Sequence, residues 1–120
     1  MKTIMLAAAT VVALTVSAFA GDEVMATRFG NTTKVTYPGN MVVKVWYNAD
    51  HTFTGVAGGN AIAGTWKIEG DKICVTTTTG AMPNVPATQC NPVVARKVGE
   101  SWTLGEGEQQ IKVELLAGKQ

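Results

Sequence analysis

Apolar and polar side chains alternate with a period of two along much of this chain, which is the pattern of half-buried β-strands. In residues 41–47, one row of apolar side chains falls on a single face: Met41, Val43, Val45 and Tyr47. In residues 110–116 the corresponding row is Ile111, Val113 and Leu115. No long stretch shows the 3.6-residue period of an amphipathic helix, so the pattern predicts an all-β protein.

Turn-forming residues divide the alternating segments from one another. The expected strands are residues 32–37, 41–47, 52–56, 61–68, 72–79, 93–98, 101–104 and 110–116. Residues 21–31 carry no clear pattern. The segment from Gly80 to Pro92 also contains Pro83 and Pro86, and we expect it to form a long loop because proline cannot donate to a strand ladder.

Consecutive strands joined by short turns form an antiparallel meander. A meander of this length leaves two unpaired edges unless the sheet closes on itself. We therefore expect a small, roughly eight-stranded up-and-down barrel, with a two-sheet β-sandwich as the alternative. The many glycine, threonine and valine residues support strands and turns in either case.

The start of the chain has the features of an export signal. Lys2 precedes a short apolar run, and residues 18–20 (Ala-Phe-Ala) have the small-x-small form that signal peptidase cleaves. The run is shorter than the roughly 20 residues that cross a bilayer. The sequence predicts a cleaved secretory signal peptide at 1–20 and a single small domain at 21–120. We expect a soluble periplasmic or secreted product without a transmembrane anchor.

Charge and cysteine content narrow the expected partners. The chain has ten basic and nine acidic residues, and cleavage after Ala20 would remove Lys2 and balance the charges. A nucleic-acid-binding protein would show a basic excess, so we expect no nucleic acid partner. Cys74 and Cys90 are the only cysteines, which in an exported chain predicts a disulfide between them. With one histidine they fall short of a closed zinc shell, and we expect no metal or cofactor.

The middle of the chain resembles a known family. Three segments carry the resemblance: 47–55 (Tyr-Asn-Ala-Asp-His-Thr-Phe-Thr-Gly), 64–68 (Gly-Thr-Trp-Lys-Ile) and 70–75 (Gly-Asp-Lys-Ile-Cys-Val). Together they are similar to the strand, D-G-T-F, strand, G-x-W, turn, G-D, strand pattern of small bacterial lipocalin-like β-barrel domains. The similarity covers residues 45–76, and His51 stands where the pattern has glycine. It implies a β-barrel.

A looser similarity links the chain to small periplasmic protease-inhibitor barrels. It rests on the size of the chain, the Gly-Thr-Trp segment and the single expected disulfide. No inhibitory segment matches residue by residue, so the similarity implies no inhibitory residues.

The residues that could support catalysis do not form a recognisable set. His51 could act as a general base or a metal ligand, but a simple exposed turn residue is the expectation we favour. Ser101 lacks the G-x-S-x-G context of a hydrolase nucleophile. Three glutamates lie in late turns and are expected to be solvated: Glu100, Glu106 and Glu108. The sequence predicts a protein that is not an enzyme and has no catalytic residues.

Three apolar side chains are candidates for contact with a ligand or partner. Trp46 lies opposite the main apolar row of its strand and would be partly exposed unless residues 21–31 cover it. Met82 and Val85 lie in the loop 80–92, where prolines restrict the backbone. These two side chains would either contact a partner or fold back to plug one end of the barrel.

These features predict an exported binding module. It would hold a small apolar ligand or a protein partner at the barrel mouth or at the loop 80–92. The alternatives are a structural or envelope-maintenance domain without a small ligand, and a periplasmic protease-inhibitor-like barrel.

Overall fold

The computed structural model describes residues 21–80 and 86–120. The predicted signal peptide at 1–20 and the predicted contact residues Met82 and Val85 lie outside the described residues, and they stay predictions. Within the described ranges, no helix is long and apolar enough to cross a membrane.

The described residues form eight strands and two short 3-10 segments. The 3-10 segments are η2 (Asp22–Arg28) and η3 (Gly107–Gln109). The strands are β1 (Thr32–Tyr37), β2 (Met41–Tyr47), β3 (Thr52–Ala57), β4 (Asn60–Glu69), β5 (Lys72–Thr79), β6 (Thr88–Pro92), β7 (Ser101–Leu104) and β8 (Ile111–Leu116). The fold is all-β, as the alternation predicts.

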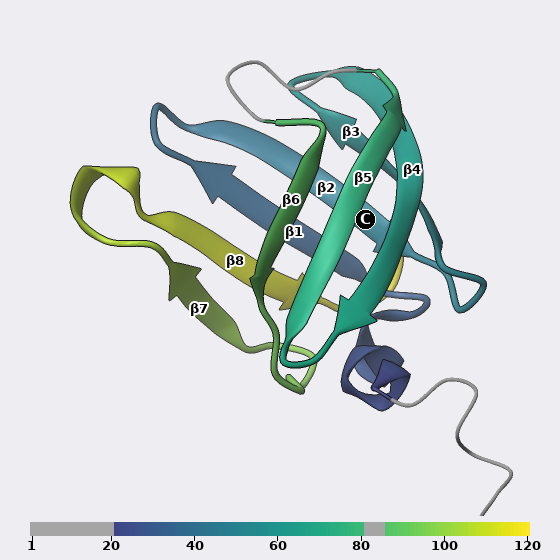
Figure 1. Ribbon diagram of the computed structural model, residues 1–120. Helices are drawn as coiled ribbons and strands as arrows, with labels where there is room; N and C mark the ends of the chain where they lie inside the picture. Colours follow the sequence, from purple (N-terminus) through teal and green to yellow (C-terminus); the bar gives the residue numbers. More distant parts are fainter. Residues whose placement is uncertain (1–20, 81–85) are drawn as a thin grey trace, which may run out of the picture.

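All eight strands belong to one antiparallel sheet with the order β6-β5-β4-β3-β2-β1-β8-β7. The sheet curls into a nearly closed barrel, with β6 and β7 as its two edges (Figure 1). No ladder joins β6 to β7 within the described residues. The η2 segment lies at one end of the barrel, which we call the helix end. The predicted up-and-down barrel is confirmed, and the sandwich alternative is not.

Side chains face inward or outward as the alternation predicts. On β2, Val43 and Val45 are buried and line the barrel interior, whereas Trp46 lies on the outer face. On β8, Val113 is buried and Lys112 is exposed. Because side chains alternate across a strand, each ladder contributes one row to the interior.

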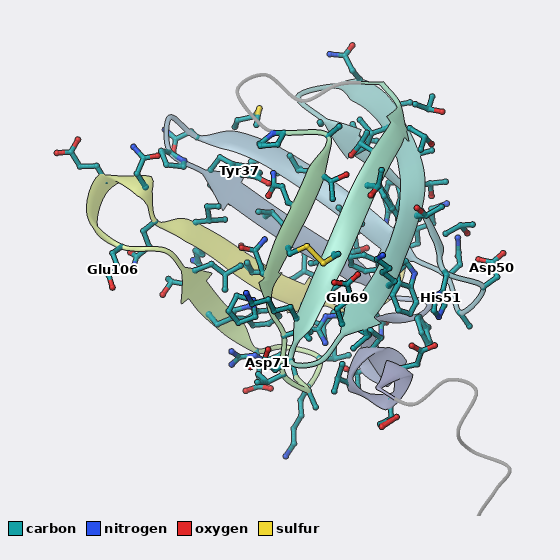
Figure 2. The ribbon with its side chains drawn as sticks, in the orientation of Figure 1. Tyr37, Asp50, His51, Glu69, Asp71 and Glu106 are labelled. Carbon is teal, nitrogen blue, oxygen red and sulfur yellow. A yellow bond between two sulfur atoms is a disulfide. The ribbon has the colours of Figure 1, made fainter. Side chains whose placement is uncertain are left out.

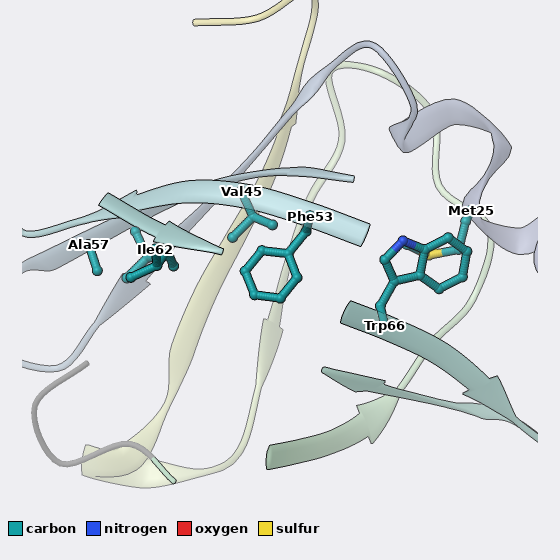
Figure 3. Packing of buried hydrophobic residues seen from close by; sticks show 7 residues of the cluster. Met25, Val45, Phe53, Ala57, Ile62 and Trp66 are labelled. Atoms are coloured by element: carbon teal, nitrogen blue, oxygen red, sulfur yellow. The ribbon is translucent and has the colours of Figure 1, made fainter. Parts of the chain in front are cut away.

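A cluster of large side chains fills the helix end of the interior. Trp66, Phe53 and Met25 are fully buried, and Met25 of η2 lies beside the Trp66 indole (Figure 3). The β4–β5 register shifts between Ala63 and Gly64. A Cβ at Gly64 would collide with a main-chain carbonyl of β5 and lie 2.8 Å from the Phe53 ring, so only glycine allows this approach.

Two expected elements between residues 80 and 98 are wrong. Residues 88–92 form strand β6 in place of the predicted loop, and Pro92 is tolerated because it ends an edge strand. The predicted strand at 93–98 is irregular. Two carbonyl groups of this segment accept hydrogen bonds from side chains of η2 instead of from a neighbouring strand. The Val94 carbonyl accepts from Arg28, and the Arg96 carbonyl accepts from Thr27.

The predicted disulfide is present between Cys74 and Cys90. The two residues lie directly opposite each other on β5 and β6. The bridge therefore fastens the edge strand β6 to its neighbour β5.

Candidate functional site

The barrel interior contains a cavity of about 120 Å³. Branched aliphatic side chains form much of its wall, among them Val35, Val43, Val45, Ile62, Ile73, Val75, Ile111 and Val113. These side chains come from β1, β2, β4, β5 and β8, so most of the barrel contributes to the wall. The two edge strands contribute as well, through Gln89 of β6 and Trp102 of β7. We call this space the barrel cavity.

The aromatic cluster around Trp66 lies at the helix end and reaches the barrel cavity through Tyr47 and Phe53, which line it. The Phe29 and Tyr47 rings lie 5.9 and 6.3 Å from the Trp66 ring, centre to centre. Trp66 Nε1 donates to the Asn48 carbonyl at 3.0 Å, which satisfies the only polar atom of the indole. The wall here is therefore fixed by both packing and hydrogen bonding.

Arg28 is the cationic side chain of the cavity wall. It ends η2 and is only 5 % exposed. Nη1 donates to the Val24 carbonyl at 2.8 Å, and Nη2 donates to the Val94 carbonyl at 3.3 Å. Burial lowers the pKa of Arg28 from its ordinary value, the nearby Tyr47 raises it, and the charge of Arg96 lowers it further. A guanidinium nonetheless stays charged at neutral pH.

Trp102 of β7 lines the cavity, and its ring lies close to two arginines, Arg28 and Arg96. Arg28 Cζ is 5.5 Å from the centre of its ring, and Arg96 Cζ is 4.4 Å away. Arg96 Nε is buried and has no hydrogen-bond partner among the described residues. Cation–π attraction offsets part of the cost of burying these charges. We call Arg28, Arg96 and Trp102 the arginine cluster.

Tyrosine and threonine hydroxyls add polar groups to the same wall. Tyr47 and Tyr37 line the cavity from β2 and β1, and burial raises the pKa of Tyr47 to about 12 and that of Tyr37 above its usual value. The charge of Arg28 acts in the opposite direction and lowers the pKa of Tyr47. Thr33 also lines the cavity, and its buried Oγ1 has no partner in the part of the chain that the structure describes.

His51 is more than the exposed turn residue that the sequence favoured. Its ring stacks on Trp66 at 4.2 Å between centres, and its Nε2 lies 2.6 Å from Oδ2 of Asp22 in η2. Its backbone has a φ of 72°, which places it in the left-handed region. Figure 2 shows His51 beside the turn after β2. The pair links η2 to the barrel wall and lies outside the barrel cavity.

Trp46 lies on the outside of the barrel, away from the barrel cavity. Its Nε1 donates to Thr32 Oγ1 at 2.9 Å, and Lys119 Nζ lies 4.8 Å from the centre of its ring. The C-terminal residues therefore cover part of Trp46, rather than residues 21–31. Trp46 also borders a shallow outer groove with Val42 and Gln120. Its predicted role in contacts stays a prediction.

The other side chains considered for catalysis or metal binding do not gather at one site among the described residues. Ser101 and the glutamates at 100, 106 and 108 are exposed, and Figure 2 shows Glu106 on an outer turn. Within residues 21–80 and 86–120, no three His, Cys, Asp or Glu side chains gather where they could hold a metal ion. The sequence pattern does not indicate Arg28, Thr33 and Trp102 as lining residues, whereas the inward row of β2 correctly includes Tyr47.

Comparisons were made with protein-family models, curated proteins and solved structures. None of the three found a match, so the site itself must carry any proposal about function.

Proposed function

We propose that this protein is a binding module that holds a small, mainly apolar molecule in the barrel cavity. The observation that carries the proposal is a cavity of about 120 Å³ walled by aliphatic side chains and bordered by a few polar groups. Binding sites for small molecules have this composition, with apolar walls and a small number of placed polar groups. For scale, an apolar cavity of about 150 Å³ in another protein stays dry and binds benzene.

The proposed entrance to the barrel cavity lies between the two edge strands, β6 and β7. Gln89 and Asn91 of β6 and Trp102 and Leu104 of β7 all line the cavity, and no ladder joins these two strands within the described residues. Separating β6 from β7 breaks no ladder hydrogen bond, so a ligand could enter there at lower cost than through a paired wall.

The proposal is binding without catalysis. The titratable side chains at the cavity are arginine and tyrosine, with Tyr47 at a pKa of about 12. Both keep one protonation state near neutral pH, whereas a general acid or base works best with a pKa near the working pH. We also propose that the protein acts in the periplasm or outside the cell, where a disulfide such as Cys74–Cys90 persists.

The test is a thermal melting series with small apolar compounds, namely benzene, indole and octanol. A ligand that binds only the folded protein stabilises it by about 2.7 kcal/mol at one hundred times its Kd. We expect a raised melting temperature with at least one compound, together with a change in Trp102 fluorescence because this side chain lines the cavity.

A matched pair of variants separates the barrel cavity from the outer groove. Val75→Phe adds a ring inside the cavity, and Val42→Phe adds the same ring beside the groove near Trp46. We expect Val75→Phe to remove binding and Val42→Phe to retain it. The opposite result would move the site to the outer groove. A folded protein that binds none of the compounds would argue against the proposal.

A further inference from the structure

Several hydrogen-bond donors in and beside the wall of the barrel cavity lack an acceptor among the described residues. A guanidinium has five N–H groups and no acceptor. For Arg28, the structure gives two bonds to main-chain carbonyls, which leaves N–H groups without a protein acceptor in the described residues. Arg96 Nε and Thr33 Oγ1 are buried nearby without any partner there. Three side chains of this region therefore carry unused donors.

No carboxylate of the chain supplies the missing acceptor. All nine Asp and Glu residues lie in the described ranges, none of them is buried, and none lines the cavity. Asp22 shares η2 with Arg28, but its carboxylate contacts His51. Figure 2 shows Asp50 and Glu106 on outer turns, away from the barrel interior.

The missing acceptors matter because two of the side chains concerned, Arg28 and Arg96, carry a positive charge. Burying a guanidinium is costly unless it is paired with an anion or fully hydrogen-bonded. Here Arg28 is 5 % exposed, and a second guanidinium, that of Arg96, lies against the same Trp102 ring. Two main-chain carbonyls and the ring compensate only part of this cost. An anion entering the cavity would be attracted by both arginines.

We propose that the ligand of the barrel cavity carries a carboxylate, or an equivalent oxyanion, that binds at the arginine cluster while its apolar part lies against the aliphatic wall. The inference rests on the proposed function, since it names the chemical class of the molecule that the cavity holds. In this proposal Arg28 binds the anion from the wall, and the hydroxyls of Tyr47 and Thr33, which line the same cavity, donate to it.

Isothermal titration of the wild-type protein with octanoate and with octanol tests the proposal. The two probes share an apolar chain and differ in the charged group. Hydrogen bonds to charged groups are strong enough to expect octanoate to bind about 10- to 100-fold more tightly. Equal affinities would overturn the anion proposal and leave the apolar site intact. Failure of both probes to bind would overturn this proposal and count against the proposed function as well.

Two variants test whether Arg28 is the residue that makes octanoate bind more tightly than octanol. Arg28→Met keeps an apolar side chain of similar length, and Lys112→Met removes an exposed, outward-facing cation of β8. We expect Arg28→Met to lose the preference for octanoate over octanol, while Lys112→Met keeps this preference. A preference that survives in folded Arg28→Met would overturn the assignment to this residue.

A measurement on the wild-type protein covers the case in which Arg28→Met does not fold. Octanoate brominated beside the carboxylate should quench Trp102 more strongly than octanoate brominated at the far end of its chain, because Trp102 lies against Arg28. Stronger quenching by the far-end bromine would place the carboxylate away from the arginine cluster and overturn the proposal.

Discussion

Tyr37 and Tyr47 are the only two tyrosines of the chain, and both line the barrel cavity. Burial raises the pKa of Tyr47 to about 12 and also raises that of Tyr37. In the unfolded chain both phenols ionise near the ordinary value of 10. The folded state therefore prefers the neutral phenols, and this preference stabilises it fully below pH 10 and is lost as the pH rises toward 12.

We predict that a spectrophotometric titration of the folded protein shows both phenols ionising above their ordinary pKa, with Tyr47 the later of the two. Stability toward urea should fall over the same pH window. Tyr47→Phe should remove the later step and leave the step of Tyr37 in place. Two phenols that titrate together near pH 10 in the folded protein would contradict the described burial.

Individual site residues differ in how far the sequence could predict them. The strand period places Tyr47 on the inner face, because its row includes Val43 and Val45. Arg28 could not be predicted, since residues 21–31 have no period and its burial depends on contacts with a segment 66 residues away. His51 was misjudged for the same reason, because Asp22 reaches it only when η2 is in place.

At the scale of elements, strand β6 shows where the alternation of apolar and polar residues fails to predict a strand. Its inward side chains, Gln89 and Asn91, are polar, so the segment 88–92 has no apolar row to indicate a strand. Residues 93–98 mislead in the opposite direction, because valines at 93, 94 and 98 favour strands. There the carbonyls bond to side chains of η2 instead of a ladder. The other strands follow strong alternation or clear turns, and they were predicted nearly to the residue.

The bridge between β5 and β6 yields a prediction about stability. Among the strands that the structure describes, β6 pairs with β5 alone, so the disulfide and one ladder hold this edge. In the chain-entropy model, a closed loop of this size contributes about 3 kcal/mol. We predict that the double variant Cys74→Ala, Cys90→Ala still folds but loses about this amount in urea unfolding.

Hydrogen exchange tells where that loss occurs. The amides of β6 should exchange faster in the double variant. The amides of β2 should remain better protected from exchange than those of β6, because β2 is paired on both sides. Reduced wild-type protein should behave like the variant. Unchanged stability in both would show that the β5 ladder holds the edge without the bridge.

At the scale of the whole molecule, cleavage after Ala20 stays a prediction, and it would change the contacts of Gly21. The backbone nitrogen of Gly21 lies 3.3 and 3.2 Å from the two carboxylate oxygens of Glu23. A new amino terminus there would carry a positive charge and gain a charge-assisted hydrogen bond. We predict that the intact mass of the exported protein corresponds to a chain that starts at Gly21. Exported protein that retains Met1 would contradict the signal peptide.

Around the sheet from its β7 edge, the strands follow one another as β7, β8, β1, β2, β3, β4, β5 and β6. This is the order of the chain except at one step, from β8 to β1, where Thr33 pairs with Leu115. The same step brings the C-terminal residues close to β1, since the Gln120 nitrogen donates to Thr32 Oγ1 at 2.7 Å.

A circular permutant that begins at Gly99, and in which a flexible linker joins residue 120 to residue 21, would therefore have every ladder between strands adjacent in its sequence. It would also keep residues 93–98 after β6, where Val94 accepts from Arg28. Folding rates rise as paired segments come closer together in the sequence. We expect this permutant to form the same barrel and to fold faster than the natural order in stopped-flow experiments, with little change in its unfolding rate.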